Sequence, residues 1–232
     1  MNPLILYLYT HKTVYVSAMS CNHKFARQLH LETLDFEPTT LIVGTFIPEW
    51  PANNVAWFYG PVLDSDGNRS NNFWDVLPKL YGEPGLVDAT PTAWTQFCRD
   101  KQIAITGLIS SIDDADQSNK EHVKVLTGFD DKAIAWHFED FVFVNVVQLL
   151  RRHPSIRHVY LTRSITESFW RHLWNPVMQY CSVNHLDERR LLTPSGHSLY
   201  QHEAYNAENP GHPILLLEDY ILMRWRQEWH SL

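Results

Sequence analysis

The run Leu41-Ile42-Val43-Gly44-Thr45-Phe46 is the stretch of sequence that best predicts the fold. Its apolar residues are continuous rather than alternating with polar ones, which is typical of a strand buried on both faces of a parallel sheet. Gly44 ends the apolar part, and Pro48 and Pro51 follow in a tight loop. Because loops after buried parallel strands commonly hold the binding site of an α/β protein, we expect this loop to be functional.

Apolar segments elsewhere in the chain extend this pattern of strands and helices. Strands are predicted at residues 103–106, 158–162 and 190–192, and helices at residues 94–100, 165–173 and 214–229. Strands that alternate with helices predict βαβ units, which place a parallel sheet between two layers of helices. We therefore expect an α/β fold, a three-layer αβα sandwich with a short central parallel sheet.

Two segments are open to more than one assignment. Residues 141–147 have the β-branched content of a strand, but their position before the next strand also suits a helix. Residues 123–126 fit either a short strand or a turn.

Composition limits the organisation of the chain. A length of 232 residues with 44% apolar residues suits one domain, which we assign to residues 21–232 after an N-terminal arm, 1–20, of no assigned role. The net charge of -7, without a long run of Lys or Arg, restricts any contact with nucleic acid to a local one. Cys21, Cys98 and Cys181 lie far apart and form no CxxC pair, which favours a reducing, cytoplasmic location.

Several common functional motifs are missing from the sequence. It contains no Walker loop, no GxGxxG and no GxSxG, and its histidines have no ligand partners at metal-binding spacing. The apolar start of the chain is too short to span a bilayer. We therefore expect no metal, no cofactor and no membrane association.

The strongest functional signal is a set of motifs in a fixed order. Gly44-Thr45-Phe46-Ile47-Pro48 is followed by Phe58-Tyr59-Gly60, Asn71-Asn72-Phe73-Trp74 and, near the end, Leu192-Thr193-Pro194-Ser195-Gly196-His197-Ser198. This order resembles the uracil-DNA glycosylase superfamily, in its mismatch-specific uracil and hypoxanthine-DNA branch. The resemblance runs from about residue 21 to the C-terminus. It implies a uracil-DNA glycosylase-like fold and cleavage of a flipped, deaminated base from DNA.

The resemblance assigns the catalytic position to Asn71, with Asn72 as its neighbouring rival. Cleavage of an N-glycosidic bond passes through a cationic sugar and an anionic base, so the enzyme must stabilise separated charge and supply a water molecule. An Asn amide can orient that water, although it is a poor base. Asn71 is the first candidate because it stands two places before Phe73, as in the family's Asn-x-Phe-Trp segment.

The same resemblance implies a pocket for the base. Its residues would be Gly44, Thr45, Phe46, Pro48, Phe58, Tyr59 and Asp131. Tyr59 would carry the stacked base, and the alternative is an aromatic side chain folded onto the core. Asp130 or Asp131 would accept an N–H of the base, and the alternative is a capping role at the helix that Lys132 begins.

The second loop would grip phosphates and separate the strands. Its candidate DNA-binding residues are Pro194, Ser195, Gly196, His197 and Ser198. The alternative is an ordinary turn. Thr45 and Thr193 depart from the family pattern. The family has an acidic residue or Asn at the position of Thr45 and a His at the position of Thr193. His197, four residues past Thr193, is the nearest residue that could replace the missing His as a donor.

These residues predict a monofunctional DNA glycosylase that acts as a monomer on DNA containing uracil or hypoxanthine. Two alternatives stay open. The chain could be a nucleic-acid-binding relative that has lost catalysis, or a hydrolase of free nucleosides on the same scaffold.

Overall fold

The computed structural model describes residues 20–25, 34–61 and 69–230 of the chain, and a four-stranded parallel sheet forms its centre. The strand order is β3-β2-β6-β7, so β2 lies between β3 and β6. The strands are β2 (Thr40–Gly44), β3 (Ile103–Gly107), β6 (His158–Leu161) and β7 (Asp187–Arg190). The predicted strands at residues 103–106 and 158–162 are confirmed, whereas β7 ends where the strand at 190–192 was expected.

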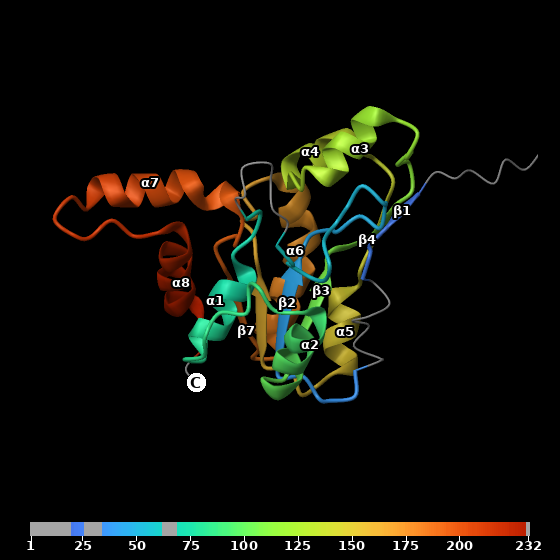
Figure 1. Cartoon of the computed structure of the whole chain (residues 1–232). Coiled ribbons are helices and arrows are strands. Elements are labelled where there is room, and N and C mark those ends of the chain that lie inside the picture. Colours follow the sequence, from blue (N-terminus) through green and yellow to red (C-terminus); the bar gives the residue numbers. More distant parts are fainter. Residues whose placement is uncertain (1–19, 26–33, 62–68, 231–232) are drawn as a thin grey trace, which may run out of the picture.

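Helices cover both faces of this sheet (Figure 1). Leu41 and Val43 point to one face, and their neighbour Ile42 points to the other, as the two-residue period of a strand requires. The first face packs against α5 (Val146–Arg152) and α6 (Ser168–Val183). The second packs against α1 (Phe73–Leu80), α2 (Pro91–Asp100) and α8 (Leu217–Glu228). The expected three-layer αβα sandwich is confirmed.

A second, antiparallel sheet extends the fold beyond the predicted architecture. It contains β1 (Cys21–Asn22), β4 (Ile109–Ile112) and β5 (Phe141–Phe143), with β4 in the middle. The ambiguous segment 141–147 therefore divides: its first residues form β5, and Val146 begins α5. Asn145 separates the two because its side chain caps α5 by accepting from the Gln148 N–H.

The expectation of a strand or turn at residues 123–126 was wrong. These residues lie in α3 (Lys120–Thr127), whose first turn is capped by the Asn119 side chain. One face of this helix buries Leu126 completely, and the polar residues around Leu126 remain outside. Helical periodicity and a good N-cap outweigh the β-branched residues Val123 and Val125.

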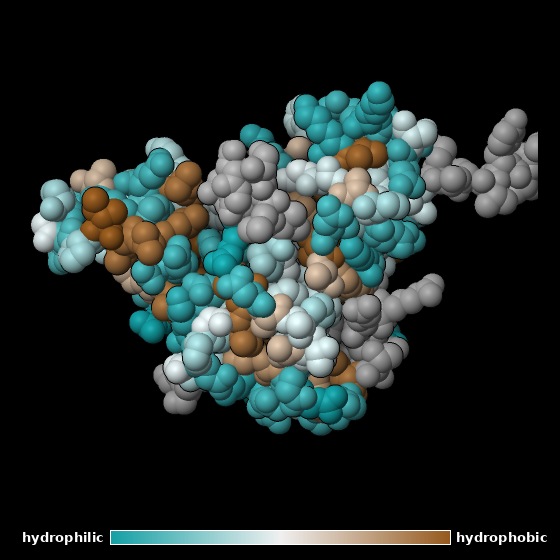
Figure 2. Space-filling view, in the orientation of Figure 1, coloured by the Kyte–Doolittle hydropathy of each residue, from teal (hydrophilic) through white to brown (hydrophobic). Residues whose placement is uncertain are grey.

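Two helical segments stand above the carboxyl ends of the parallel strands, on opposite sides (Figure 1). One side carries α3 with α4 (Asp131–His137), and the other carries α7 (Leu199–Glu208), which follows the short 3-10 helix η2 (Gly196–Ser198). The surface view shows apolar residues along the arm that α7 and its return segment form (Figure 2). Ile214 and Leu216 of the return segment are exposed. The predicted arm 1–20 lies outside the described residues except for Ser20. In the described part of the chain, no helix has the length and apolar character needed to cross a membrane.

Candidate functional site

A cavity of about 1150 Å³ opens at the carboxyl ends of the parallel strands. Each of the four strands delivers residues to it: Gly44 ends β2, Gly107 ends β3, Thr162 follows β6 and Leu191 follows β7. This edge is where open parallel sheets bind their ligands, because the loops that leave the strands converge there.

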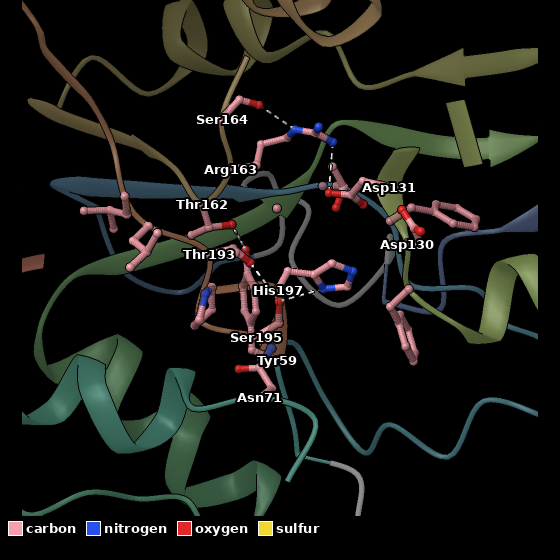
Figure 3. Close-up of a pocket in the computed structure, with 18 of the residues that line it drawn as sticks. Tyr59, Asn71, Asp130, Asp131, Thr162, Arg163, Ser164, Thr193, Ser195 and His197 are labelled. Carbon is pink, nitrogen blue, oxygen red and sulfur yellow. Dashed lines mark hydrogen bonds and ion pairs between the residues drawn. The ribbon is translucent and has the colours of Figure 1, made fainter. Parts of the chain in front are cut away.

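The two segments that carry the strongest motifs meet at this cavity. Asn71 and Ser195 form an isolated antiparallel bridge, and the Asn72 N–H donates to the Pro194 carbonyl at 2.7 Å. Asn71 and Ser195 lie together on one side of the cavity, and Asp131 with Arg163 lies on another side (Figure 3). Main-chain hydrogen bonds thus hold together two loops that are far apart in the sequence.

Asn71 lines the cavity, whereas Asn72 does not. The Asn71 Oδ1 accepts a hydrogen bond from the Phe73 N–H at 2.8 Å, which fixes the side chain at the start of α1. Asn72 is the N-cap residue of α1, and its backbone is used in the link to Pro194. Of the two predicted catalytic residues, Asn71 is therefore the one placed to contact a bound molecule.

Tyr59 is held rigidly between the core and the cavity. Its ring stacks on Phe73 with the ring centres 4.0 Å apart and the planes 4° apart. Its hydroxyl lies 2.7 Å from the Thr162 Oγ1, and burial raises the pKa of the Tyr59 phenol. Gly44 makes this position possible, since a Cβ at residue 44 would lie 2.5 Å from the Tyr59 hydroxyl oxygen. The ring thus packs on the core, as one interpretation of Tyr59 has it, and it also lines the cavity, where stacking of a base stays a prediction.

The two neighbouring aspartates have different roles. Asp130 caps α4, accepting from the Lys132 and Ala133 N–H groups at 2.9 and 3.2 Å. Asp131 pairs with the Arg163 guanidinium at 2.9 Å, and its side chain is 27% exposed. The alternatives left open by the sequence therefore divide between the pair: Asp130 fulfils the capping role, and the Asp131 carboxylate lies beside the cavity.

Opposing effects act on the Asp131 carboxyl group. Burial raises its pKa, while the Arg163 charge, a hydrogen bond from the Thr45 hydroxyl and the nearby His197 lower it, and the result lies above the usual range. A carboxyl group in a cleft with a raised pKa and a specific charged partner is a common feature of functional sites.

Arg163 is a site residue that the sequence analysis missed. Besides Asp131, its guanidinium contacts Glu167 at 3.2 Å and the Ser164 carbonyl at 2.9 Å, and it lies 3.8 Å from the centre of the Trp170 ring. These contacts hold the Asp131 carboxylate in one orientation. Arg163 directly follows a predicted strand, but it belongs to no motif that would have singled it out.

Hydrogen bonds among its own side chains and backbone hold the second loop in shape. The Thr193 Oγ1 lies 3.1 Å from the Ser195 Oγ, which is in turn 3.2 Å from the His197 Nδ1. The fully buried Ser198 donates to the Thr193 carbonyl at 2.6 Å. Ser198 therefore shapes the loop and does not line the cavity, whereas Ser195 and His197 do.

Most, but not all, of the other predicted residues line the cavity. Thr45, Phe46, Phe58, Pro194 and Gly196 line it. Pro48 does not, and its carbonyl accepts from the Asn53 side chain within the loop. A histidine that the sequence analysis did not consider, His23, also lines the cavity, and burial lowers its pKa to about 4.

The chain is similar to one solved structure among the known proteins compared with it. No protein-family model matches the chain, and no curated protein matches it. Among solved structures, the chain is similar to the solution NMR structure of a candidate uracil DNA glycosylase from Methanosarcina acetivorans. The two chains are 13% identical, the match covers 83% of this chain and 94% of that chain, and the TM-score is 0.46. A similarity of this size assigns neither a family nor an activity.

Charge is distributed unevenly over the molecule. The chain has a net charge of -7, yet more cationic than anionic side chains line the cavity. The cations are Arg69, Lys132, Arg163, Arg171, Arg190 and Arg224, and the carboxylates are Asp130, Asp131, Glu167 and Glu228. Within the described ranges, no group of His, Cys, Asp and Glu is arranged to hold a metal ion. The excess of cationic side chains along the cavity therefore suits a ligand that carries negative charge.

Proposed function

We propose that the protein is a monofunctional DNA glycosylase, which hydrolyses the N-glycosidic bond of a uracil or hypoxanthine base in DNA. One observation carries this proposal: the Asn71 loop and the Ser195 loop, joined main chain to main chain, border one cavity beside an aromatic side chain. The cavity, at about 1150 Å³, is somewhat larger than the usual small-molecule site of about 300–1,000 Å³, so it has room for a nucleoside with part of its backbone.

The base would enter the cavity after rotating out of the duplex and would stack on Tyr59. Stacking of a base on an aromatic ring contributes about 1–3 kcal/mol. Because Phe73 holds the Tyr59 ring from behind, little conformational freedom is lost when the base binds. Asp131, fixed by Arg163, would accept an N–H group at the edge of the base.

Bond cleavage would then use the Asn71 side chain. The C1′–N bond breaks and its electron pair leaves with the base, while a water oxygen bonds to C1′ and releases its proton to solvent. Asn71 would orient that water, since its Oδ1 is already held by the Phe73 N–H and its amide group borders the cavity. The products would be the free base and an abasic site.

The cationic side chains around the cavity other than Arg163, which is paired with Asp131 and Glu167, would contact phosphates on either side of the flipped nucleotide. Such contacts position the strand without reading its sequence. Ser195, Gly196 and His197 would approach the same strand from the second loop. We expect the enzyme to act as a cytoplasmic monomer without a cofactor.

The direct test is excision from oligonucleotides that contain one deoxyuridine or deoxyinosine. We expect abasic sites to form with the wild-type protein. Asn71→Ala should reduce the excision rate at least tenfold, which corresponds to raising the activation free energy by about 1.4 kcal/mol. Asn71→Asp is the matched control, because its carboxylate keeps the hydrogen bond from the Phe73 N–H while placing a stronger base at the cavity.

The possible outcomes separate the alternatives. Oligonucleotide binding without abasic sites, even at high protein concentration, would favour a nucleic-acid-binding protein that lacks catalysis. Turnover of free deoxyuridine or deoxyinosine that oligonucleotides do not inhibit would favour a nucleoside hydrolase. Equal excision by wild type and Asn71→Ala would remove Asn71 from the mechanism.

A further inference from the structure

A histidine near the N-terminal end of the chain, next to β1 of the antiparallel sheet, is buried beside the cavity. His23 follows β1, is 5% exposed and contributes to the cavity wall. Its ring packs among Phe25, Phe46 and Phe58, with ring centres 5.2 to 6.4 Å away. An apolar surrounding of this kind favours the neutral form of imidazole, in keeping with the pKa of about 4.

The hydrogen bonding of His23 determines which nitrogen carries its proton. The Nδ1 accepts a hydrogen bond from the Phe25 N–H at 3.1 Å. A neutral imidazole has one donor and one acceptor nitrogen, so the proton is on Nε2. The main chain therefore fixes His23 as an N–H donor.

Gly107 makes room for this donor at the end of β3. A Cβ on Gly107 would lie 2.9 Å from both the Nε2 and the Cδ2 of His23. Gly107 is also the register partner of Gly44, over which the Tyr59 hydroxyl lies. Two adjacent strands thus end in glycine, and each glycine leaves room for one ring: the Tyr59 phenol over Gly44 and the His23 imidazole over Gly107.

We propose that His23 determines base specificity by donating its Nε2–H to a carbonyl oxygen of the bound base. This inference rests on the proposed function. Uracil and hypoxanthine carry a carbonyl where cytosine and adenine carry an amino group. A buried donor facing an amino group leaves two donors unpaired, which a closed site penalises strongly. His23 would therefore select oxo bases over their amino counterparts.

Two substitutions separate the donor from the fold. In His23→Asn the side-chain oxygen can still accept a hydrogen bond from the Phe25 N–H, because Asn side chains commonly bond to the backbone two residues on. The shorter Asn side chain places no donor beside Gly107. His23→Phe keeps the aromatic packing and removes both nitrogens. His212→Phe changes an exposed histidine outside the cavity and serves as the matched control.

The experiment combines NMR with an excision assay. Protein labelled with ¹⁵N at histidine is titrated with free uracil, hypoxanthine, cytosine and adenine, and the His23 Nε2 signal is identified by its loss in His23→Asn. We expect hypoxanthine or uracil to shift this signal and the amino bases to leave it unchanged. Both His23 variants should bind the oxo base at least about tenfold more weakly than His212→Phe.

Each result has a separate meaning. An oxo base that shifts the His23 signal without any excision from DNA would support His23 and overturn the proposed function. Excision from DNA that is equally selective in His23→Asn and wild type would overturn His23 and leave the glycosylase intact. If no base shifts the signal and no DNA is cleaved, both proposals fail.

Discussion

Gly44 and Tyr59 depend on each other at the level of single residues. The glycine leaves the space that the phenol oxygen occupies, and the phenol in turn stacks on Phe73. We expect Gly44→Ala to lower the free energy of unfolding by about 1–3 kcal/mol, the usual cost of an added methyl group in a packed site. Urea denaturation measures this change.

A second substitution should remove most of the cost of Gly44→Ala. In Gly44→Ala with Tyr59→Phe, the oxygen nearest to the new Cβ is gone, and the Cζ at 3.2 Å needs only a small shift. Tyr59→Phe alone loses the hydrogen bond to Thr162, so we expect Gly44→Ala to cost much less stability in the Tyr59→Phe background than in the wild-type protein. Gly196→Ala, where an added Cβ meets no atom within 4 Å, should stay within about 0.5 kcal/mol of wild type. A fully stable Gly44→Ala protein would contradict this account.

Single residues of the site were predictable from sequence only where they belong to motifs. Asn71, Tyr59 and Ser195 stand in recognisable segments after predicted strands, and the structure brings all three to one cavity. His23 and Arg163 stand in no motif. Their place at the cavity depends on strand pairing and on the Arg163 contact with Asp131, which a single sequence does not reveal.

At the level of the elements, α4 depends on its N-cap. The Asp130 side chain accepts two backbone N–H groups, and the next residue, Asp131, contributes to the cavity. We expect Asp130→Ala to lower the free energy of unfolding by about 1 kcal/mol, and Asp130→Asn, which can keep both hydrogen bonds, to cost much less. Thermal unfolding of the two variants tests this, and equal losses would argue against the cap.

Elements with a strong period were predictable, and elements fixed by tertiary pairing were not. The continuous apolar runs gave β2, β3 and β6 because these strands are buried on both faces. β5 has three residues and one pairing partner, so local propensity does not define its ends. α7 buries none of its residues, which leaves no apolar period to detect.

At the level of the whole molecule, two histidines make stability depend on pH. Burial lowers the pKa of both His23 and His230 from 6.5 to about 4. Between these values the unfolded chain binds protons that the folded chain does not, so the free energy of unfolding falls as the pH drops from 6.5 toward 4. Once the pH is below both pKa values, His23 has lowered the free energy of unfolding by on the order of 3 kcal/mol.

The His23→Phe variant isolates this effect. We expect urea denaturation at pH 7 and pH 5 to show a smaller difference for His23→Phe than for wild type, with His212→Phe behaving like wild type. His230 keeps part of the dependence in all three proteins, and Asp131, whose pKa is raised, acts in the opposite direction. If the free energy of unfolding changes equally between pH 7 and pH 5 in His23→Phe and wild type, His23 does not titrate in this way.

The link between the Asn72 amide and the Pro194 carbonyl bears on protein engineering. Since the two loops that this link joins lie more than 120 residues apart in the sequence, neither can be transplanted onto another scaffold alone. A chain split inside the intervening region, for example in the exposed stretch around residue 118, would put one loop on each fragment. Recovery of ligand binding on mixing such fragments would report directly that they had reassembled.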